Sequence, residues 1–201
     1  MTDPKPAESG SRVRTRTAIL DAAVEALTAD RQASMTEIAA AAHVGRTTVH
    51  RYFPERADLI RAVFHHVGER GQGAIRRAEP HSGPVRDAVR RVVEECMGFG
   101  PILVYLYSEP LLTAEPELEN ALRGMEEAVE EVLARPDTGL NSEFPRIWIR
   151  QAFWALLYAG WETAQTSEIP RHQIVEMILT TFTQGFYGPQ DSEIQDHNSA
   201  S

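Results

Sequence analysis

The sequence predicts an all-α fold of about nine helices, and two observations carry this prediction. Between residues 13 and 187 nearly every segment has apolar residues at helical spacing, and no stretch alternates apolar and polar residues as a strand does. Prolines and glycines separate these segments, where they end one helix or begin the next. The hydrophobic content of 42% and the charged content of 24% are close to those of ordinary globular proteins.

The expected helices follow one another with short connections. The first carries an apolar stripe at helical spacing, formed by Ile19, Leu20, Ala23, Val24 and Leu27. The nine expected helices cover residues 15–29, 34–42, 46–53, 54–69, 84–97, 101–109, 117–134, 145–166 and 170–187.

A capping box marks the start of the second expected helix. In the stretch SMTE, the Ser34 hydroxyl can accept a hydrogen bond from the backbone N–H of Glu37, and the Glu37 carboxylate can reach back to Ser34. The third helix follows after a brief turn and stops at Pro54, which also suits the first turn of the fourth helix.

The third expected helix has one polar face and one apolar face. At 100° per residue its polar side chains fall within an arc of about 140°; they are Arg46, Thr47, His50 and Arg51. Val49 and Phe53 lie on the opposite side. In a helix-turn-helix the apolar face packs on the preceding helix, and the other face enters the major groove of DNA. Arginine, threonine and histidine can all contact base edges, so these four polar residues are the candidates for reading sequence.

The stretch IAAAAHVGRTTVHRYFPERADLIRAVF resembles the N-terminal signature of the tetracycline-repressor (TetR) family of regulators. The shared features are an Ile-Ala helix, a tight turn with valine, a short recognition helix ending in Tyr-Phe, and a basic residue opening the next helix. The resemblance implies that the same four residues read bases. It also implies phosphate contacts, which fix the position on DNA without reading sequence, from Thr36, Thr48, Tyr52 and Arg56.

Two positions depart from the family pattern. His43 stands where the family usually has glycine, and Gly45 stands where a serine or threonine usually caps the recognition helix. Histidine tolerates a positive φ and glycine can serve as an N-cap, so we expect the turn to form.

Four parts are expected along the chain. They are a disordered tail at 1–12, a helix-turn-helix DNA-binding domain at 13–56, a larger helical domain for ligand binding and dimerisation at 57–187, and a second disordered tail at 188–201. Both tails are polar and lack periodic apolar positions.

The last two expected helices are candidates for a dimer interface. Residues 147–161 distribute apolar and aromatic side chains around the whole helix, so one face should be covered by a second chain. The family resemblance implies the same pairing, as a four-helix bundle in a homodimer. The expected interface residues are Phe153, Trp161, Ile174, Ile178, Phe182 and Phe186.

Several aromatic and methionine side chains suit an apolar pocket, and they would equally suit an ordinary core. They are Met97, Tyr105, Tyr107, Met125, Trp154 and Tyr158. The family resemblance implies that such a pocket holds a small-molecule inducer.

The net charge of −9 is distributed unevenly along the chain. Residues 1–70 carry 10 Lys or Arg and 9 Asp or Glu, whereas residues 71–201 carry 10 and 20. Because exposed charges are screened beyond about 8 Å at physiological salt, the acidic second part does not prevent the first part from binding DNA. No apolar run reaches the length of a membrane span, no secretory signal is visible and Cys96 is the single cysteine, so we expect a cytoplasmic protein with no membrane association.

A metal site or a cofactor is not expected. His65 and His66 are adjacent on a helix and therefore point about 100° apart, and no GxSxG, HExxH or P-loop motif is present. The leading interpretation is a non-enzymatic repressor that binds a palindromic double-stranded operator and is released by an inducer. Two alternatives stay open: a DNA-binding dimer controlled by a protein partner without a small molecule, and a helical-bundle enzyme.

Overall fold

The computed structural model describes residues 10–136, 140 and 144–184, and these residues form helices with no strand. The predicted all-α class is confirmed. In chain order the elements are α1 (Gly10–Ala29), α2 (Met35–Ala41), α3 (Arg46–Tyr52), α4 (Arg56–Arg77), α5 (Val85–Cys96), α6 (Gly100–Tyr107), α7 (Pro110–Ala114), the 3-10 helix η1 (Pro116–Leu118), α8 (Glu119–Leu133), α9 (Arg146–Thr166) and α10 (Arg171–Gln184). Helix α1 begins earlier than expected, and α7 has no counterpart among the nine expected helices.

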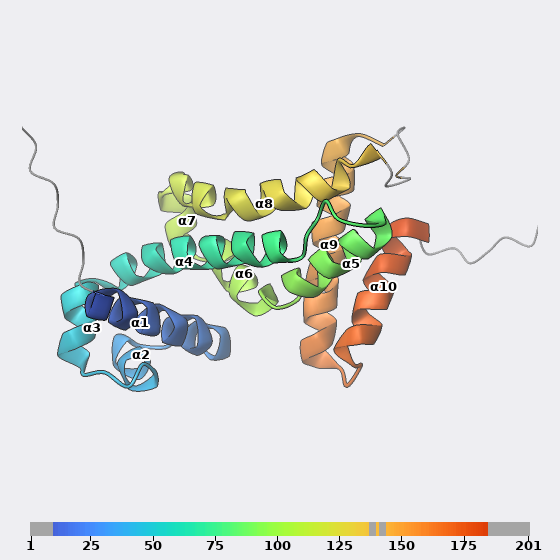
Figure 1. Ribbon diagram of the computed structural model, residues 1–201. Helices are drawn as coiled ribbons and strands as arrows, with labels where there is room; N and C mark the ends of the chain where they lie inside the picture. Colours follow the sequence, from blue (N-terminus) through green and yellow to red (C-terminus); the bar gives the residue numbers. More distant parts are fainter. Residues whose placement is uncertain (1–9, 137–139, 141–143, 185–201) are drawn as a thin grey trace, which may run out of the picture.

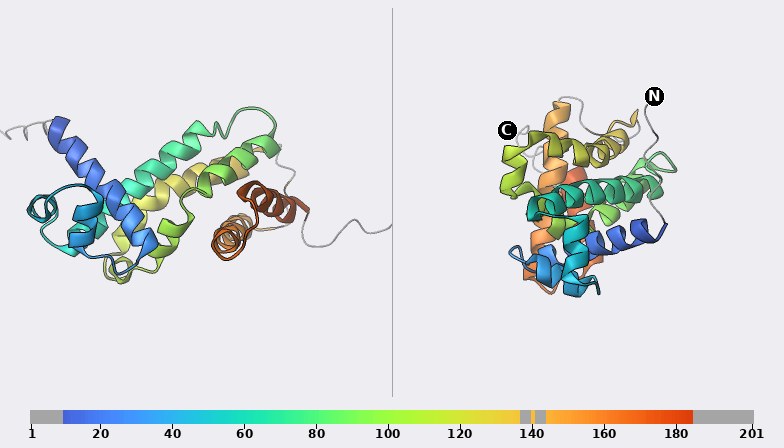
Figure 2. Two further views of the ribbon diagram at one scale, coloured as in Figure 1. Left: turned by 90° about the horizontal axis from the view of Figure 1, so that it is seen from below. Right: turned by 90° about the vertical axis from the view of Figure 1, so that its left-hand side faces the viewer.

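Helices α1, α2 and α3 form a unit at one end of the molecule, and α9 and α10 lie at the other end (Figure 1). Helix α4 leaves the three-helix unit and runs through the larger part of the protein, with α8 beside it. Helices α9 and α10 pack against each other as a neighbouring pair (Figure 2, left). The DNA-binding candidates and the dimer candidates are therefore at opposite ends.

Close packing of α4 on α8 depends on glycine. A Cβ atom on Gly68 would lie 1.8 Å from the carbonyl oxygen of Ala121, so the two backbones meet where no other side chain fits. One turn later, Gly71 leaves room for the sulfur of Met125, which is 1% exposed. The pair α4 and α8 thereby forms the central layer on which the other helices pack.

One continuous apolar core joins the two ends of the molecule. It extends from Ile19 and Leu20 in α1 through Phe64 in α4 to Phe153 in α9. Burial of an apolar side chain of this size contributes about 1.5–3 kcal/mol. The three-helix unit is therefore held on the larger part by packing as well as by the chain itself.

Polar side chains add links between elements on the surface. The Asp21 carboxylate on α1 accepts a hydrogen bond from Arg70 Nη1 at 2.6 Å and lies 2.8 Å from Nε2 of His66. Arg61 of α4 binds both carboxylate oxygens of Glu115, and these hydrogen bonds hold the pKa of Glu115 below its ordinary value. His66 is thus engaged in an ion-pair cluster between α1 and α4.

Candidate nucleic-acid interface and ligand cavity

Helix α2 begins with the capping box that the sequence predicts. The Ser34 hydroxyl accepts from the backbone N–H of Glu37 at 3.2 Å, and the Glu37 carboxylate accepts from the backbone N–H of Ser34 at 2.7 Å. The hydrogen bond from the Ser34 backbone N–H lowers the pKa of Glu37, because it favours the charged carboxylate. The box fixes where α2 starts and therefore where α3 follows.

The turn between α2 and α3 contains one left-handed residue, which is His43 with φ 53°. The backbone N–H of Val44 donates to the carbonyl oxygen of Ala39 at 3.0 Å, which closes the turn over the end of α2. Gly45 is the N-cap of α3 with φ −68° and ψ 145°, and it offers no side chain to the first N–H groups of the helix. The turn forms despite both departures from the family pattern, with α3 uncapped by a side chain.

Helix α3 buries one side and exposes the other. Val49 is 0% exposed and Phe53 is 3% exposed, and both belong to the core that contains Ile38 of α2. Arg46, Thr47 and Arg51 are exposed. The N-terminal three-helix unit therefore presents a short helix whose outward face carries two arginines and a threonine.

His50 is half-buried and is held by two neighbours. Its Nδ1 lies 3.3 Å from the carbonyl oxygen of Pro54, and its Nε2 lies 3.4 Å from Nε of Arg46. A neutral imidazole with the proton on Nδ1 satisfies both contacts, donating to Pro54 and accepting from Arg46. Arg46 and His50 therefore form one polar pair on α3.

The four phosphate candidates occupy different environments. Thr36 is exposed, while Thr48 and Tyr52 are half-buried beside the outward face of α3. The guanidinium of Arg51 lies 5.5 Å from the ring centre of Tyr52. Arg56 instead donates to the backbone carbonyls of Ala33 and Arg31, the latter at 3.3 Å, and so binds the loop before α2 to the start of α4.

Helix α6 contacts the DNA-binding unit through its last turn. Arg31 Nη1 donates to the Ser108 hydroxyl at 3.0 Å, and α6 packs on α1. Tyr105 donates its hydroxyl proton to Glu109 at 2.7 Å, and burial together with this hydrogen bond raises the pKa of Tyr105 to about 12. A movement of α6 would therefore displace the loop that leads into α2.

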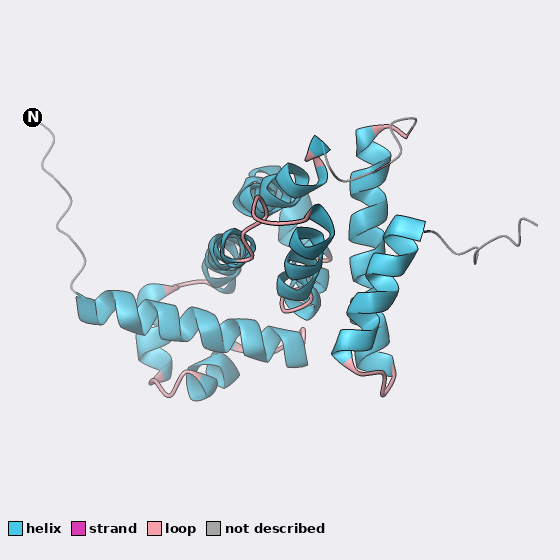
Figure 3. Cartoon of the chain, turned by 45° about the vertical axis from the view of Figure 1, so that its right-hand side comes forward, coloured by secondary structure: helices cyan, strands magenta, loops and turns pink. Residues whose placement is uncertain are grey.

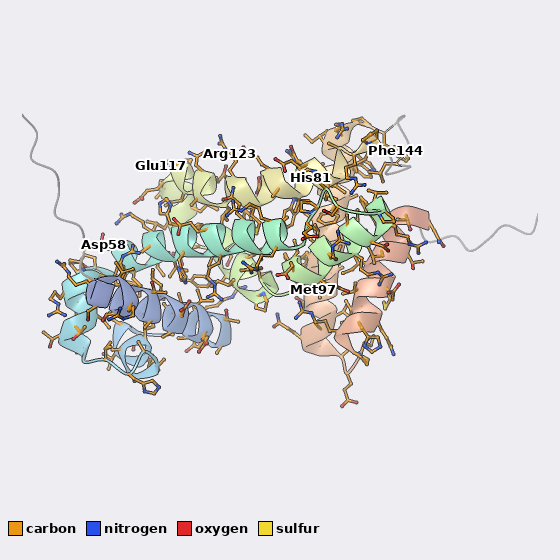
Figure 4. All side chains as sticks on the ribbon, viewed as in Figure 1. Asp58, His81, Met97, Glu117, Arg123 and Phe144 are labelled. Carbon is orange, nitrogen blue, oxygen red and sulfur yellow. The ribbon has the colours of Figure 1, made fainter. Side chains whose placement is uncertain are left out.

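The six residues expected in a ligand pocket differ in exposure. Met97, Tyr105 and Met125 are buried in the core, Trp154 is half-buried, and Tyr107 and Tyr158 are exposed. Met97, which Figure 4 labels at the end of α5, has its sulfur against Gly160 of α9.

A cavity lies between the last turns of α8 and the first turns of α9. Its volume is about 890 Å³, within the range of small-molecule sites. Its wall combines acidic, basic and apolar side chains, among them Glu127, Leu133, Phe144, Ile147 and Arg150. A smaller apolar cavity of about 210 Å³ shares Leu133 and Leu140 with it and reaches α5 and α10. Neither cavity was predicted from the sequence, because their walls come from several separate segments.

Most residues expected at the dimer interface pack inside a single chain. Phe153, Trp161, Ile174 and Ile178 are at most 6% exposed, and Phe182 is half-buried; Phe186 lies outside the described residues. Trp161 packs against Gly100 of α6, and its indole N–H has no hydrogen-bond partner among the described residues.

The outward faces of α9 and α10 carry a second set of apolar side chains. Trp148, Tyr158 and Met177 are 59%, 51% and 51% exposed. The two helices lie side by side at one end of the molecule, as seen in Figure 3. Their outward faces therefore remain available to a second chain.

Neither the cysteine nor the histidines form a reactive or metal-binding cluster in the described part of the chain. Burial raises the pKa of Cys96 to about 12, so its thiol stays protonated at neutral pH. Among residues 10–136, 140 and 144–184, no three His, Cys, Asp or Glu side chains are close enough to hold a metal ion. Within the same residues, no helix is both long and apolar enough for a bilayer.

The capped helix, the tight turn and the short two-faced helix define a helix-turn-helix protein, a class that binds DNA through the second helix of the motif. Residues 19–63 match the model for "Bacterial regulatory proteins, tetR family". The chain belongs to this family. It is accordingly a transcriptional regulator and not an enzyme.

A regulator of known function has a closely similar sequence. The chain is 51% identical over 185 residues to the HTH-type transcriptional repressor LfrR of Mycolicibacterium smegmatis, and the match covers 92% of this chain and 96% of LfrR. The solved structure of LfrR from Mycobacterium smegmatis in complex with proflavine has a TM-score of 0.79 at 49% identity, covering 89% of this chain and 99% of that one. A second LfrR structure has a TM-score of 0.65 at 46% identity, covering 85% and 99%.

Proposed function

We propose that this protein is a dimeric, cytoplasmic repressor that binds a palindromic operator through α3 and is released from it by a small-molecule inducer. DNA binding is supported by the two faces of α3, because Val49 lies in the core and Arg46, Thr47 and Arg51 are exposed. Repression is supported by the 51% identity to the repressor LfrR.

Two groups of residues divide the work at the DNA. The polar pair Arg46 and His50, with Thr47 and Arg51, reads base edges in the major groove. Thr36, Thr48, Tyr52 and Arg56 position the protein on phosphates. Arg56 uses two N–H groups on the loop carbonyls and keeps others for a phosphate, because a guanidinium has five.

The proposed dimer pairs α9 and α10 of two chains through the exposed face that carries Trp148, Tyr158 and Met177. A two-fold arrangement would place the two copies of α3 in successive major grooves about 34 Å apart. An inducer would act by favouring a conformation in which this separation is wrong. The contact of α6 with the loop before α2 provides a physical route for that change.

The inducer class that we propose is a planar aromatic cation. LfrR has been crystallised in complex with proflavine, and this chain is 49% identical to LfrR in that structure. The cavity between α8 and α9 offers exposed Glu127 beside apolar Leu133 and Ile147. Its wall also carries Glu130, Glu131, Arg135, Arg146 and Arg150, so its acidic and basic groups balance and the proposed class rests on the similarity to LfrR.

The direct test is binding to the DNA upstream of the protein's own gene, measured by fluorescence anisotropy against a scrambled duplex. We expect preferential binding to the upstream duplex and dissociation when proflavine is added. Equal affinity for both duplexes would contradict the proposed operator. Specific binding that proflavine and related cations leave unchanged would favour the alternative of control by a protein partner.

Tryptophan fluorescence locates the ligand, because all three tryptophans, Trp148, Trp154 and Trp161, lie on α9. If proflavine occupies the cavity between α8 and α9, quenching should need more proflavine in Ile147→Ala, which alters the wall of that cavity, and should be unchanged in Trp154→Phe. The reverse result would place the ligand among the aromatic residues expected from the sequence.

A further inference from the structure

We propose that the first two turns of α1 form a second DNA contact, in which Arg12, Arg14 and Arg16 bind phosphates beside the base pairs that face α3. This inference rests on the proposed DNA-binding function and adds an element that neither the helix-turn-helix nor its phosphate candidates include. We call residues 10–16 the basic arm.

Within the described residues, the basic arm concentrates positive charge at the start of α1. Arg12, Arg14 and Arg16 are exposed, and no Asp or Glu occurs in α1 before Asp21. Asp21 is itself occupied by Arg70 and His66. The arm therefore carries three guanidinium groups that no carboxylate of the described residues neutralises.

Arginines elsewhere in the protein are mostly bound to oxygen atoms of the chain. Arg61 and Arg90 bind the carboxylates of Glu115 and Glu176, and Arg91 binds backbone carbonyls. In the described residues, the arginines of the basic arm and of α3 have no such oxygen partner, and neither do Arg76, Arg77, Arg86 and Arg123. The five arginines on α1 and α3 are gathered at one end of an acidic protein, whose net charge is −9, and they indicate an anionic partner at that end.

One contact shows where the arm lies relative to α3. The guanidinium of Arg16 lies 5.5 Å from the ring centre of Phe53, the residue that ends α3 and is 3% exposed. Arg12 is one helical turn before Arg16, about 6 Å along the axis, and so extends the basic surface from the end of α3. Figure 1 shows the beginning of α1 and α3 at the same end of the molecule.

A phosphate contact is the chemistry that fits this surface. Arginine binds phosphate oxygens with two parallel hydrogen bonds, and the amino-terminal end of a helix adds partial positive charge. Exposed arginines on a helix that lies outside the helix-turn-helix have no means of reading bases in the groove that α3 occupies. The arm should therefore raise affinity for all DNA and leave sequence preference unchanged.

The test compares two double variants of the full-length protein that remove the same charge. Arg12→Ala/Arg14→Ala alters the arm, and Arg76→Ala/Arg123→Ala alters exposed arginines on α4 and α8, of which Figure 4 labels Arg123. Affinity for the upstream duplex and for its scrambled form is measured between about 50 and 200 mM salt, a range over which phosphate binding weakens steeply. Circular dichroism confirms that each variant retains its helices.

We expect the arm variant to bind both duplexes at least about ten-fold more weakly at about 0.1 M salt, with an unchanged ratio between them. The salt slope of log K should become shallower by about 0.9 for each phosphate that the dimer no longer neutralises. The control variant should retain the wild-type slope. An arm variant with the affinity and slope of the control would overturn this inference while leaving the proposed function standing. A wild-type protein that binds neither duplex would overturn both, and one that binds both equally would overturn only the proposed operator.

Discussion

His43 holds the turn between α2 and α3 in a left-handed backbone conformation, with φ 53°. Its side chain is exposed and forms no hydrogen bond or ion pair among the described residues that would compensate for the strain of that conformation in an L-amino acid. Glycine adopts the same conformation without a Cβ penalty. The strain at position 43 therefore arises because the residue there is not glycine.

We expect His43→Gly to raise the free energy of unfolding by about 0.5–1 kcal/mol, after allowance for the greater freedom of glycine in the unfolded chain. His43→Ala should lower it, because alanine tolerates a positive φ less well than histidine. Urea denaturation of the wild type and the two variants measures the order of their free energies of unfolding. A His43→Gly protein less stable than the wild type would show that the imidazole has a stabilising partner in solution.

The buried face of α3 could be predicted from the sequence, because Val49 and Phe53 are spaced four residues apart and therefore lie on the same side of the helix. The internal role of Arg56 was not predictable. Its partners are the backbone carbonyls of Arg31 and Ala33, more than twenty positions earlier. Because every residue has a backbone carbonyl, the sequence does not indicate which ones Arg56 binds.

At the scale of elements, the backbones of α4 and α8 come so close together that only glycine fits at the contact. Gly68 faces the carbonyl of Ala121, whereas Gly73, on the same helix, has only the flexible ends of Arg76 and Arg77 nearby. The two glycines thus serve as a matched pair in one helix, the first required for packing and the second dispensable.

Gly68→Ala should destabilise the protein by about 1–3 kcal/mol or more, because the helices must separate to admit the methyl group. Gly73→Ala should be neutral or stabilise by up to about 1 kcal/mol through higher helix propensity. Thermal unfolding followed by circular dichroism measures both. Equal melting temperatures for the two variants would mean that α4 and α8 do not approach each other so closely in solution.

The sequence predicted every helix except the short α7, although it ended α4 at residue 69 and the helix continues to Arg77. Helix α7 has five residues, too few for a periodic apolar pattern, and lies between prolines 110 and 116. The apolar faces of α9 were also ambiguous, because a helix that is apolar all round does not reveal which side faces its own chain. Phe153 and Trp161 proved to face inward and Trp148 and Tyr158 outward.

For the whole molecule, the proposed regulation requires two chains, one at each half of the operator. Met177 is 51% exposed on α10 and belongs to the outward apolar face of the last two helices. A carboxylate at this position would be buried without a partner if the proposed interface forms, and such burial is strongly unfavourable.

Met177→Glu should therefore shift the protein from dimer to monomer, as measured by light scattering after size-exclusion chromatography. Thr113→Glu, on the exposed surface of α7, is the matched control and should remain dimeric. The monomeric variant should also bind a palindromic duplex far more weakly. Persistence of the dimer in Met177→Glu would rule out this face as its interface.

Sequence reading by the outward face of α3 is the central claim, and the measurement that tests it is the ratio of affinities for operator and scrambled duplex. This ratio is measured for the wild type and for the variants Arg46→Ala and Arg123→Ala. We predict that Arg46→Ala lowers the operator affinity by about 1–3 kcal/mol and reduces the ratio accordingly, whereas Arg123→Ala leaves the ratio unchanged. An Arg46→Ala protein that keeps the wild-type ratio would contradict the assignment of base reading to α3.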